Sequence, residues 1–285
     1  MTAFPFLAQR LFNTPLIVHP GKAEIIMAAL AERLGVTQLT RADGAAVTLS
    51  APSLSGDPEP ERPYDVTGDG IAIIPVRGTL VQRNGLHPWS GMTGLDGVRT
   101  KFALALADDD VRAIIFDIDS PGGEVAGTFD LADGIYGARG VKPMHAILNE
   151  GAYSGAYALA SACDWISVPR TGGAGSIGVI ALLVDFSKAL TSAGIAVNII
   201  QFGKHKADGN QAVPLSDDAR ARFQDQVDEI GELFVSTIAR NRGLRTAQVR
   251  ATEAATFLGA EAVSLGLADI VSSPDAAYRA LAPSL

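Results

Sequence analysis

The feature of this sequence that most restricts its fold is a regular alternation of short apolar runs and helical stretches, which begins near Gly70. The runs are GIAIIPVRG (70–78), VRAIIFDID (111–119), MHAILNE (144–150), WISV (165–168), IGVIALLV (177–184) and VNIIQF (197–202). Short apolar runs bounded by glycine and polar residues are typical of buried strands. Because strands that alternate with helices form α/β folds, we expect a largely parallel sheet with flanking helices.

The helical stretches between these runs include one long amphipathic helix, expected over Asp217–Arg242. Its apolar side chains recur at helical spacing: Phe223, Val227, Ile230, Phe234 and Ile238. Shorter helices are expected over residues 98–106, 129–136 and 186–193, and a helix of small residues should follow Ala152.

The first 63 residues differ in residue pattern and composition from the rest of the chain. Gly21–Leu34 reads as a helix, and residues 42–63 are rich in Gly, Pro, Ser and Asp, which is typical of a linker. We therefore expect a helical appendage and linker over residues 1–63, and one main domain over residues 64–285.

Composition excludes several classes of protein. With 47% hydrophobic and 19% charged residues, the chain has enough apolar material for a core and is not a disordered protein. The single cysteine excludes a disulfide framework and a cysteine-built zinc site, and the net charge of −8 argues against a general nucleic-acid binder. No apolar run reaches the ~18 residues of a membrane span, so we expect a soluble protein of the cytoplasm.

Functional groups in such folds gather where strands end and helices begin, and two junctions here carry candidate groups. Ser154 follows a strand and opens the helix of small residues, so its hydroxyl is either a nucleophile or a helix N-cap. The Ser-Pro-Gly-Gly segment at 120–123 is either a tight turn or a source of backbone N–H donors.

A serine nucleophile needs a base, and the residues alone leave that base open. His205, Lys204 and Lys206 lie together in the polar segment that follows the run ending at Phe202. A lysine can act as a base only in its neutral form, which burial favours. Ser176 is a further hydroxyl at the start of an apolar run, where a turn or cap would equally explain it.

In their order along the chain, four segments carry a more specific signal: VRAIIFDIDSPGG, AYSGAYALASACD, TGGAGSIGV and FGKHKADGN. This set resembles the signal peptide peptidase A family of serine peptidases, in the wider Clp protease/crotonase fold group. Within that family it looks like the capsid assembly (head maturation) proteases of lambdoid phages. The similarity includes residues 90–98, 120–133 and 256–269, and it spans most of the chain.

The resemblance implies a Ser/Lys dyad. Ser154 matches the nucleophile of the family and Lys206 matches its general base, whereas Lys204 falls on a variable position and ranks second. Ser176 matches a serine that helps to hold the lysine amine. No metal or cofactor is implied.

The resemblance also implies an oxyanion hole built from backbone N–H groups. Here these belong to Gly123, Gly155 and, less directly, Gly122. One departure from the family pattern is Ala156, which stands where a glycine is common.

The implied partners are protein substrates, namely phage scaffold, portal or coat proteins in the procapsid. Relatives build one site from neighbouring subunits, so the resemblance predicts a homo-oligomer. Three alternatives stay open: a bacterial protein-quality-control protease of the same family, a crotonase-like acyl-CoA enzyme, and a degenerate protease that serves as a scaffold component.

Overall fold

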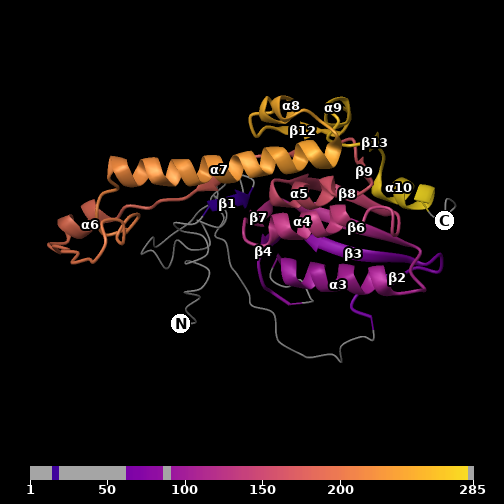
Figure 1. Ribbon diagram of the computed structural model, residues 1–285, viewed down its shortest axis with the longest axis horizontal. Coiled ribbons are helices and arrows are strands. Elements are labelled where there is room, and N and C mark those ends of the chain that lie inside the picture. Colours follow the sequence, from indigo (N-terminus) through magenta and orange to yellow (C-terminus); the bar gives the residue numbers. More distant parts are fainter. Residues whose placement is uncertain (1–14, 19–61, 86–90, 282–285) are drawn as a thin grey trace, which may run out of the picture. The chain divides into compact units, whose positions relative to one another are not determined.

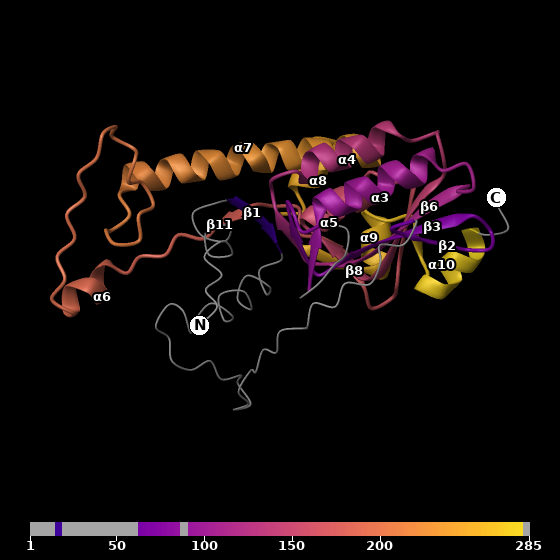
Figure 2. The ribbon, with the colours of Figure 1, turned by 90° about the horizontal axis from the view of Figure 1, so that it is seen from below.

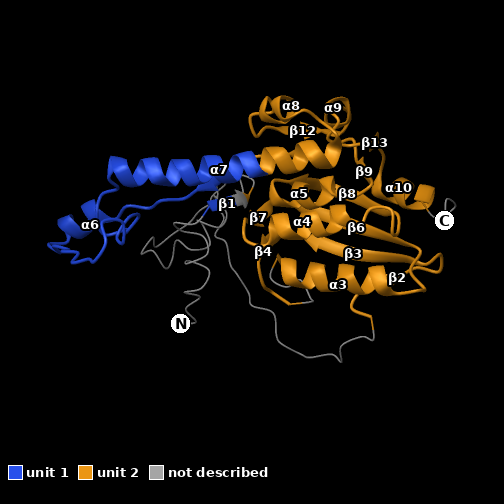
Figure 3. Ribbon diagram, viewed as in Figure 1, with its two compact units in different colours: residues 1–16, 179–233 blue, residues 17–178, 234–285 orange. Residues whose placement is uncertain are grey.

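The computed structural model describes residues 15–18, 62–85 and 91–281. The helix expected at Gly21–Leu34 and almost all of the expected linker lie outside these residues. The chain divides into two compact units (Figure 3): unit 1 contains Met1–Leu16 and Val179–Leu233, and unit 2 contains Ile17–Gly178 and Phe234–Leu285.

Unit 2 is built on a mixed sheet whose centre is parallel, as expected (Figure 1). Its strand order is β12-β10-β8-β6-β3-β2. The four central strands are parallel: β3 (Ile71–Arg77), β6 (Ala113–Ser120), β8 (Met144–Tyr153) and β10 (Gly173–Gly175). The edge strands β2 (Asp65–Val66) and β12 (Thr256–Leu258) are antiparallel, and β9 (Trp165–Val168) joins β8 to β13 (Ile270–Val271).

Helices cover both faces of this sheet, as Figure 2 shows for α3 and α4 on one face and α10 on the other. The helices that lie wholly in unit 2 are α3 (Leu95–Ala107), α4 (Thr128–Gly137), α5 (Gly155–Ser161), α8 (Thr246–Arg250), α9 (Gly259–Ser264) and α10 (Pro274–Leu281). Successive side chains of β6 point to opposite faces of the sheet: Phe116 contacts Phe102 of α3, and Ile115 packs against Leu281 of α10. The core of unit 2 is therefore closed on both sides.

A smaller parallel group lies beside this sheet in unit 2: β4 (Thr79–Val81), β5 (Met92–Gly94) and β7 (Gly122–Glu124). The chain enters this group directly after β6, because β7 begins two residues beyond Ser120, the last residue of β6. The Ser-Pro-Gly-Gly segment is thus the point at which the chain passes from one sheet to the other.

Unit 1 contains β11 (Ile180–Ala181), α6 (Ser187–Ser192) and the start of α7 (Asp217–Arg242). Pro15 and Leu16 of β1 (Pro15–Val18) pair antiparallel with β11. The strand expected over 177–184 shrinks to β11, and the strand expected over 197–202 is wrong. An apolar run becomes a strand only through hydrogen bonds to a partner, and no described strand pairs with residues 197–202.

Helix α7 has the bounds that the periodicity predicts, and it runs from unit 1 into unit 2. Phe234 and Ile238, in unit 2, are fully buried, whereas Phe223, Val227 and Ile230, in unit 1, are only half-buried. Within the described part of the chain, no helix combines the length and the hydropathy that a bilayer crossing requires.

Candidate active site

Three turns of unit 2 meet at one edge of the sheet, because they follow three adjacent parallel strands. The register pairs Ser120 of β6 with Ala152 of β8, and Tyr153 of β8 with Gly175 of β10. The residues that follow these strands therefore lie side by side. They are the sequence candidates Gly122 and Gly123, Ser154 and Gly155, and Ser176, so this edge is the candidate site.

The backbone of Ser154 adopts a conformation that is rare for any residue except glycine, with φ 53° and ψ −125°. Two hydrogen bonds hold it there. Its N–H donates to the carbonyl of Gly175 at 2.8 Å, and its carbonyl accepts from the N–H of Ala158 at 3.1 Å. Strained backbone of this kind persists only where neighbours enforce it, and it clusters at functional sites.

The hydroxyl of Ser154 has no hydrogen-bond partner among the described residues, although the side chain is buried. It does not cap α5, so the N-cap alternative is wrong. A buried hydroxyl without a partner costs about 1–3 kcal/mol. The fold therefore tolerates an unsatisfied polar group at the position where the sequence predicts a nucleophile.

The glycines beside Ser154 differ in whether their backbone N–H groups already have a hydrogen-bond acceptor. Gly122 has φ 90°, and its N–H donates to the hydroxyl of Ser120 at 3.2 Å, so this donor is already engaged. Gly155 is the first residue of α5, and the helix bonds begin at Ala158, so its N–H has no partner within the helix.

Gly123 is fixed by packing rather than by an unusual φ. A Cβ at this position would lie 1.9 Å from the carbonyl oxygen of Leu80 in β4. Only glycine allows β7 to approach β4 so closely. The oxyanion role of Gly122, Gly123 and Gly155 stays a prediction.

Ser176 lies directly after β10, beside Ser154 in register. It is buried and has φ 55°, and its N–H donates to the carbonyl of Ala255 at 2.8 Å. Two neighbouring serines of this edge thus share a strained backbone. The predicted role of Ser176 in holding a lysine amine remains untested.

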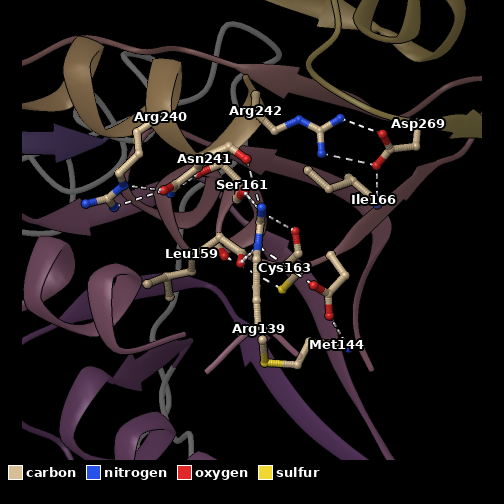
Figure 4. A network of polar contacts seen from close by, with 12 residues as sticks. Arg139, Met144, Leu159, Ser161, Cys163, Ile166, Arg240, Asn241, Arg242 and Asp269 are labelled. Atoms are coloured by element: carbon tan, nitrogen blue, oxygen red, sulfur yellow. Dashed lines mark hydrogen bonds and ion pairs between the residues drawn. The ribbon is translucent and has the colours of Figure 1, made fainter. Parts of the chain in front are cut away.

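Helix α5, which carries Ser154 at its start, is buried along its whole length and fastened at both ends. The hydroxyl of Tyr157 donates to the carbonyl of Leu267 at 2.8 Å. At the other end, Arg139 donates to the carbonyls of Ser161, Ala162 and Cys163 at 2.6–3.0 Å (Figure 4). A cation at these carbonyls satisfies the last acceptors of the helix and favours its dipole.

The same cluster ties α5 to the C-terminal end of α7. Asn241 donates through Nδ2 to the hydroxyl of Ser161 at 3.0 Å, and Arg139 also donates to the carbonyl of Asn241. Arg242 forms two hydrogen bonds with Asp269, which accepts a third from the N–H of Ile166 (Figure 4). Sequence reasoning missed Arg139, because no local pattern separates it from an ordinary surface arginine.

Lys206 lies in unit 1, in the polar segment 203–210, and its side chain is exposed. Its N–H donates to the carbonyl of Gly203 at 3.1 Å. Lys204, the second choice, has its Nζ 3.1 Å from a carboxylate oxygen of Asp218. The Lys204 side chain is thus already engaged by a carboxylate of α7. The choice of Lys206 as the base and its pairing with Ser154 stay predictions, because Lys206 and Ser154 belong to different units.

Other reactive side chains of the described residues are poor candidates. Burial raises the pKa of the Cys163 thiol, which disfavours the thiolate. His145 lies near the start of β8, at the end of the strand opposite Ser154, and burial lowers its pKa. Within residues 15–18, 62–85 and 91–281, no group of three or more His, Cys, Asp or Glu is arranged to hold a metal ion.

Comparison with known proteins gives a family match over half of the chain. The model of peptidase family S49 matches residues 138–284. The chain is 39% identical to head-tail preconnector protein GP5 of Enterobacteria phage P21 and 40% identical to capsid assembly protease C of Escherichia phage lambda. These alignments cover 96% and 95% of this chain, but only 56% and 64% of the two phage proteins.

Among solved structures, an enoyl-CoA hydratase/isomerase family member is similar with a TM-score of 0.45 and 17% identity, over 78% of this chain and 74% of that chain.

Proposed function

The chain belongs to peptidase family S49, and from this premise we propose that it is a serine endopeptidase with a Ser154/Lys206 dyad. The observation that carries the proposal is the buried, unpaired hydroxyl of Ser154 on a strained turn. A catalytic role explains both the unsatisfied hydroxyl and the strained backbone, because a nucleophile must keep its hydroxyl available for the base and the substrate.

The mechanism follows from the chemistry of the groups. Neutral Lys206 accepts the proton of the Ser154 hydroxyl as the oxygen attacks the peptide carbonyl. Backbone N–H groups of Gly155 and Gly123 bind the developing oxyanion. Protonated Lys206 then gives its proton to the leaving amine, and water hydrolyses the acyl-enzyme in a second, equivalent step.

We propose further that each site combines Ser154 of one chain with Lys206 of a second copy. Unit 1 gives this idea its physical basis. No side chain from Val179 to Asp218 is buried, although the segment contains Ile195, Ile199, Ile200 and Phe202. Leaving such side chains in water forgoes about 1.5–3 kcal/mol for each large one, and a neighbouring subunit would recover it.

Phage scaffold, portal or coat proteins in the procapsid are the proposed substrates. The support is the name of the lambda relative, a capsid assembly protease, and the 40% identity over 282 residues. The proposed place of action is the procapsid interior in the cytoplasm of an infected or prophage-bearing bacterium.

The test compares wild type, Ser154→Ala and Lys206→Ala for cleavage of co-expressed capsid and scaffold proteins. Loss of either group should lower activity by about 10⁴-fold or more, because nucleophile and base act as one unit. The matched control is Lys204→Ala, which removes a neighbouring lysine but leaves Ser154 and Lys206 in place and should therefore lose far less activity than either dyad variant. Full activity of either dyad variant would contradict the mechanism.

A further inference from the structure

The segment that carries Lys206 is attached to the start of α7 by a small network of charges, all within unit 1. Asp208 accepts from Arg222 and lies 3.2 Å from Nδ1 of His205. Asp218 lies 3.0 Å from Arg222 and 3.1 Å from Lys204. Among the described residues, Arg222 is therefore the one that joins both carboxylates.

The signs of the charges alternate between the segment and the helix. The segment presents a cation at Lys204 and an anion at Asp208, while α7 presents an anion at Asp218 and a cation at Arg222. Lys206 lies between the two attachment points, 204 and 208. Holding both points restricts the backbone from which the Lys206 side chain extends.

The network also accounts for the nearby negative charge. Asp208 contacts Arg222 and the imidazole of His205, Asp218 contacts Arg222 and Lys204, and no described carboxylate lies within ion-pair distance of Lys206. A free carboxylate near a lysine stabilises its ammonium form and so opposes its use as a base. Hydrogen bonds from Arg222 and then Lys204 hold the pKa of Asp218 below its ordinary value.

We propose that Arg222 is a positioning residue for the base: it holds the Lys206 segment on α7 and keeps Asp208 and Asp218 occupied, so that Lys206 remains free to accept a proton. This rests on the proposed Ser/Lys mechanism. The planar guanidinium suits the role, because it can bridge two carboxylates at once, which a lysine ammonium does poorly.

The ionisable residues near Lys206 in the sequence and at the start of α7 are few and can be varied singly. On the segment they are Lys204, His205 and Asp208, and on the first turns of α7 they are Asp217, Asp218, Arg220 and Arg222. Arg220 supplies a matched control, because it is exposed, lies two residues from Arg222, and has no ion pair among the described residues. Arg220→Gln and Arg222→Gln therefore make the same charge change on the same helix.

The measurement is the rate constant for labelling of Ser154 by a fluorophosphonate, followed against pH at low ionic strength on the purified assembly. In Arg222→Gln the rise of the rate with pH should move upward by about half to one pH unit, since exposed charges interact weakly. Arg220→Gln should follow the wild-type curve. Arg222→Lys should restore the position of the curve but only part of its plateau.

A double variant separates charge from anchoring. Arg222→Gln with Asp208→Asn should return the curve toward the wild-type pH, while the plateau rate stays several-fold low because the segment is then attached only through Lys204 and Asp218. The proposal is overturned if Arg222→Gln and Arg220→Gln give the same curve while Lys206→Ala is inert. If Lys206→Ala labels at the wild-type rate, the Ser/Lys mechanism itself has failed, and the two failures are thus distinct.

Discussion

The two units differ most in how they treat their apolar side chains. Unit 2 buries Phe116, Phe234 and Ile238 completely and holds Ser154 on a turn between buried strands. Unit 1 leaves Ile200 and Phe202 fully exposed and holds Lys206 through ion pairs near the surface. The serine is thus fixed by the core of its own unit, whereas the lysine segment is held by ion pairs and packs no buried side chain of its own.

Helix α7 shows the same contrast within one element. Its large apolar side chains continue along the sequence, yet Phe223, Val227 and Ile230 in unit 1 are half-buried, whereas Phe234 in unit 2 is fully buried and its ring meets Phe129 edge-on at 5.5 Å. The half-buried part of this stripe is consistent with the proposed packing against a second copy of the chain.

The sharpest way to break this contrast is to remove one phenylalanine from each unit. Phe234→Ala should lower the free energy of unfolding by about 3–5 kcal/mol, because it leaves a cavity in a closed core. Phe202→Ala should change it by less than about 0.5 kcal/mol when it is measured at low protein concentration, because the side chain is fully exposed in the single chain. Chemical denaturation gives both values.

Sedimentation then tests whether the exposed side chain of Phe202 contributes to self-association of the chain. Phe202→Ala should raise the protein concentration at which the chain assembles. An unchanged assembly, or a loss of monomer stability equal to that of Phe234→Ala, would contradict the distinction between the units.

A pair of glycine variants sharpens the claim that the serine edge is rigid. Gly123→Ala should cost about 1–3 kcal/mol, since the new Cβ would meet the Leu80 carbonyl and force β7 to shift. Gly134→Ala, on the exposed face of α4 where no atom lies within 4 Å of a Cβ, should stabilise by about 0.5–1 kcal/mol. Thermal unfolding measures both, and equal effects would show that the turn adapts.

The smallest expected effect concerns the anchoring of α5. Tyr157→Phe removes only the hydroxyl that donates to Leu267 and should cost about 0.5–1.5 kcal/mol. Because Arg139 still fastens the other end of the helix, fluorophosphonate labelling of Ser154 should stay within about twofold of wild type. A large loss of labelling would mean that this one contact positions the nucleophile.

The sequence alone predicted the elements whose pattern is local. Buried strands β3, β6, β8 and β9 and the long helix α7 follow from apolar runs and helical spacing. The run at 197–202 has the same local pattern as a buried strand, but whether such a run pairs depends on a partner that its own residues do not specify. That expectation was wrong for this reason.

The candidate site likewise combines features that the sequence predicts with features that only the structure reveals. Ser154 was recognisable from its place after a strand and from the family motif, but its strained backbone and unpaired hydroxyl emerge only from the register of β8 and β10. Arg139 could not be singled out, because the carbonyls it contacts lie far along the chain. The contact of Arg222 with Asp218 is an ordinary i,i+4 pair on a helix, and its contact with Asp208 depends on how the segment folds back onto α7.

The most direct test of the central claim is to co-express Ser154→Ala and Lys206→Ala chains with different tags and to assay the doubly tagged oligomers. If each site joins Ser154 of one copy to Lys206 of another, both single variants are inactive and mixed oligomers regain about a quarter of the wild-type sites. Mixed oligomers that form but remain inactive would contradict a site shared between subunits.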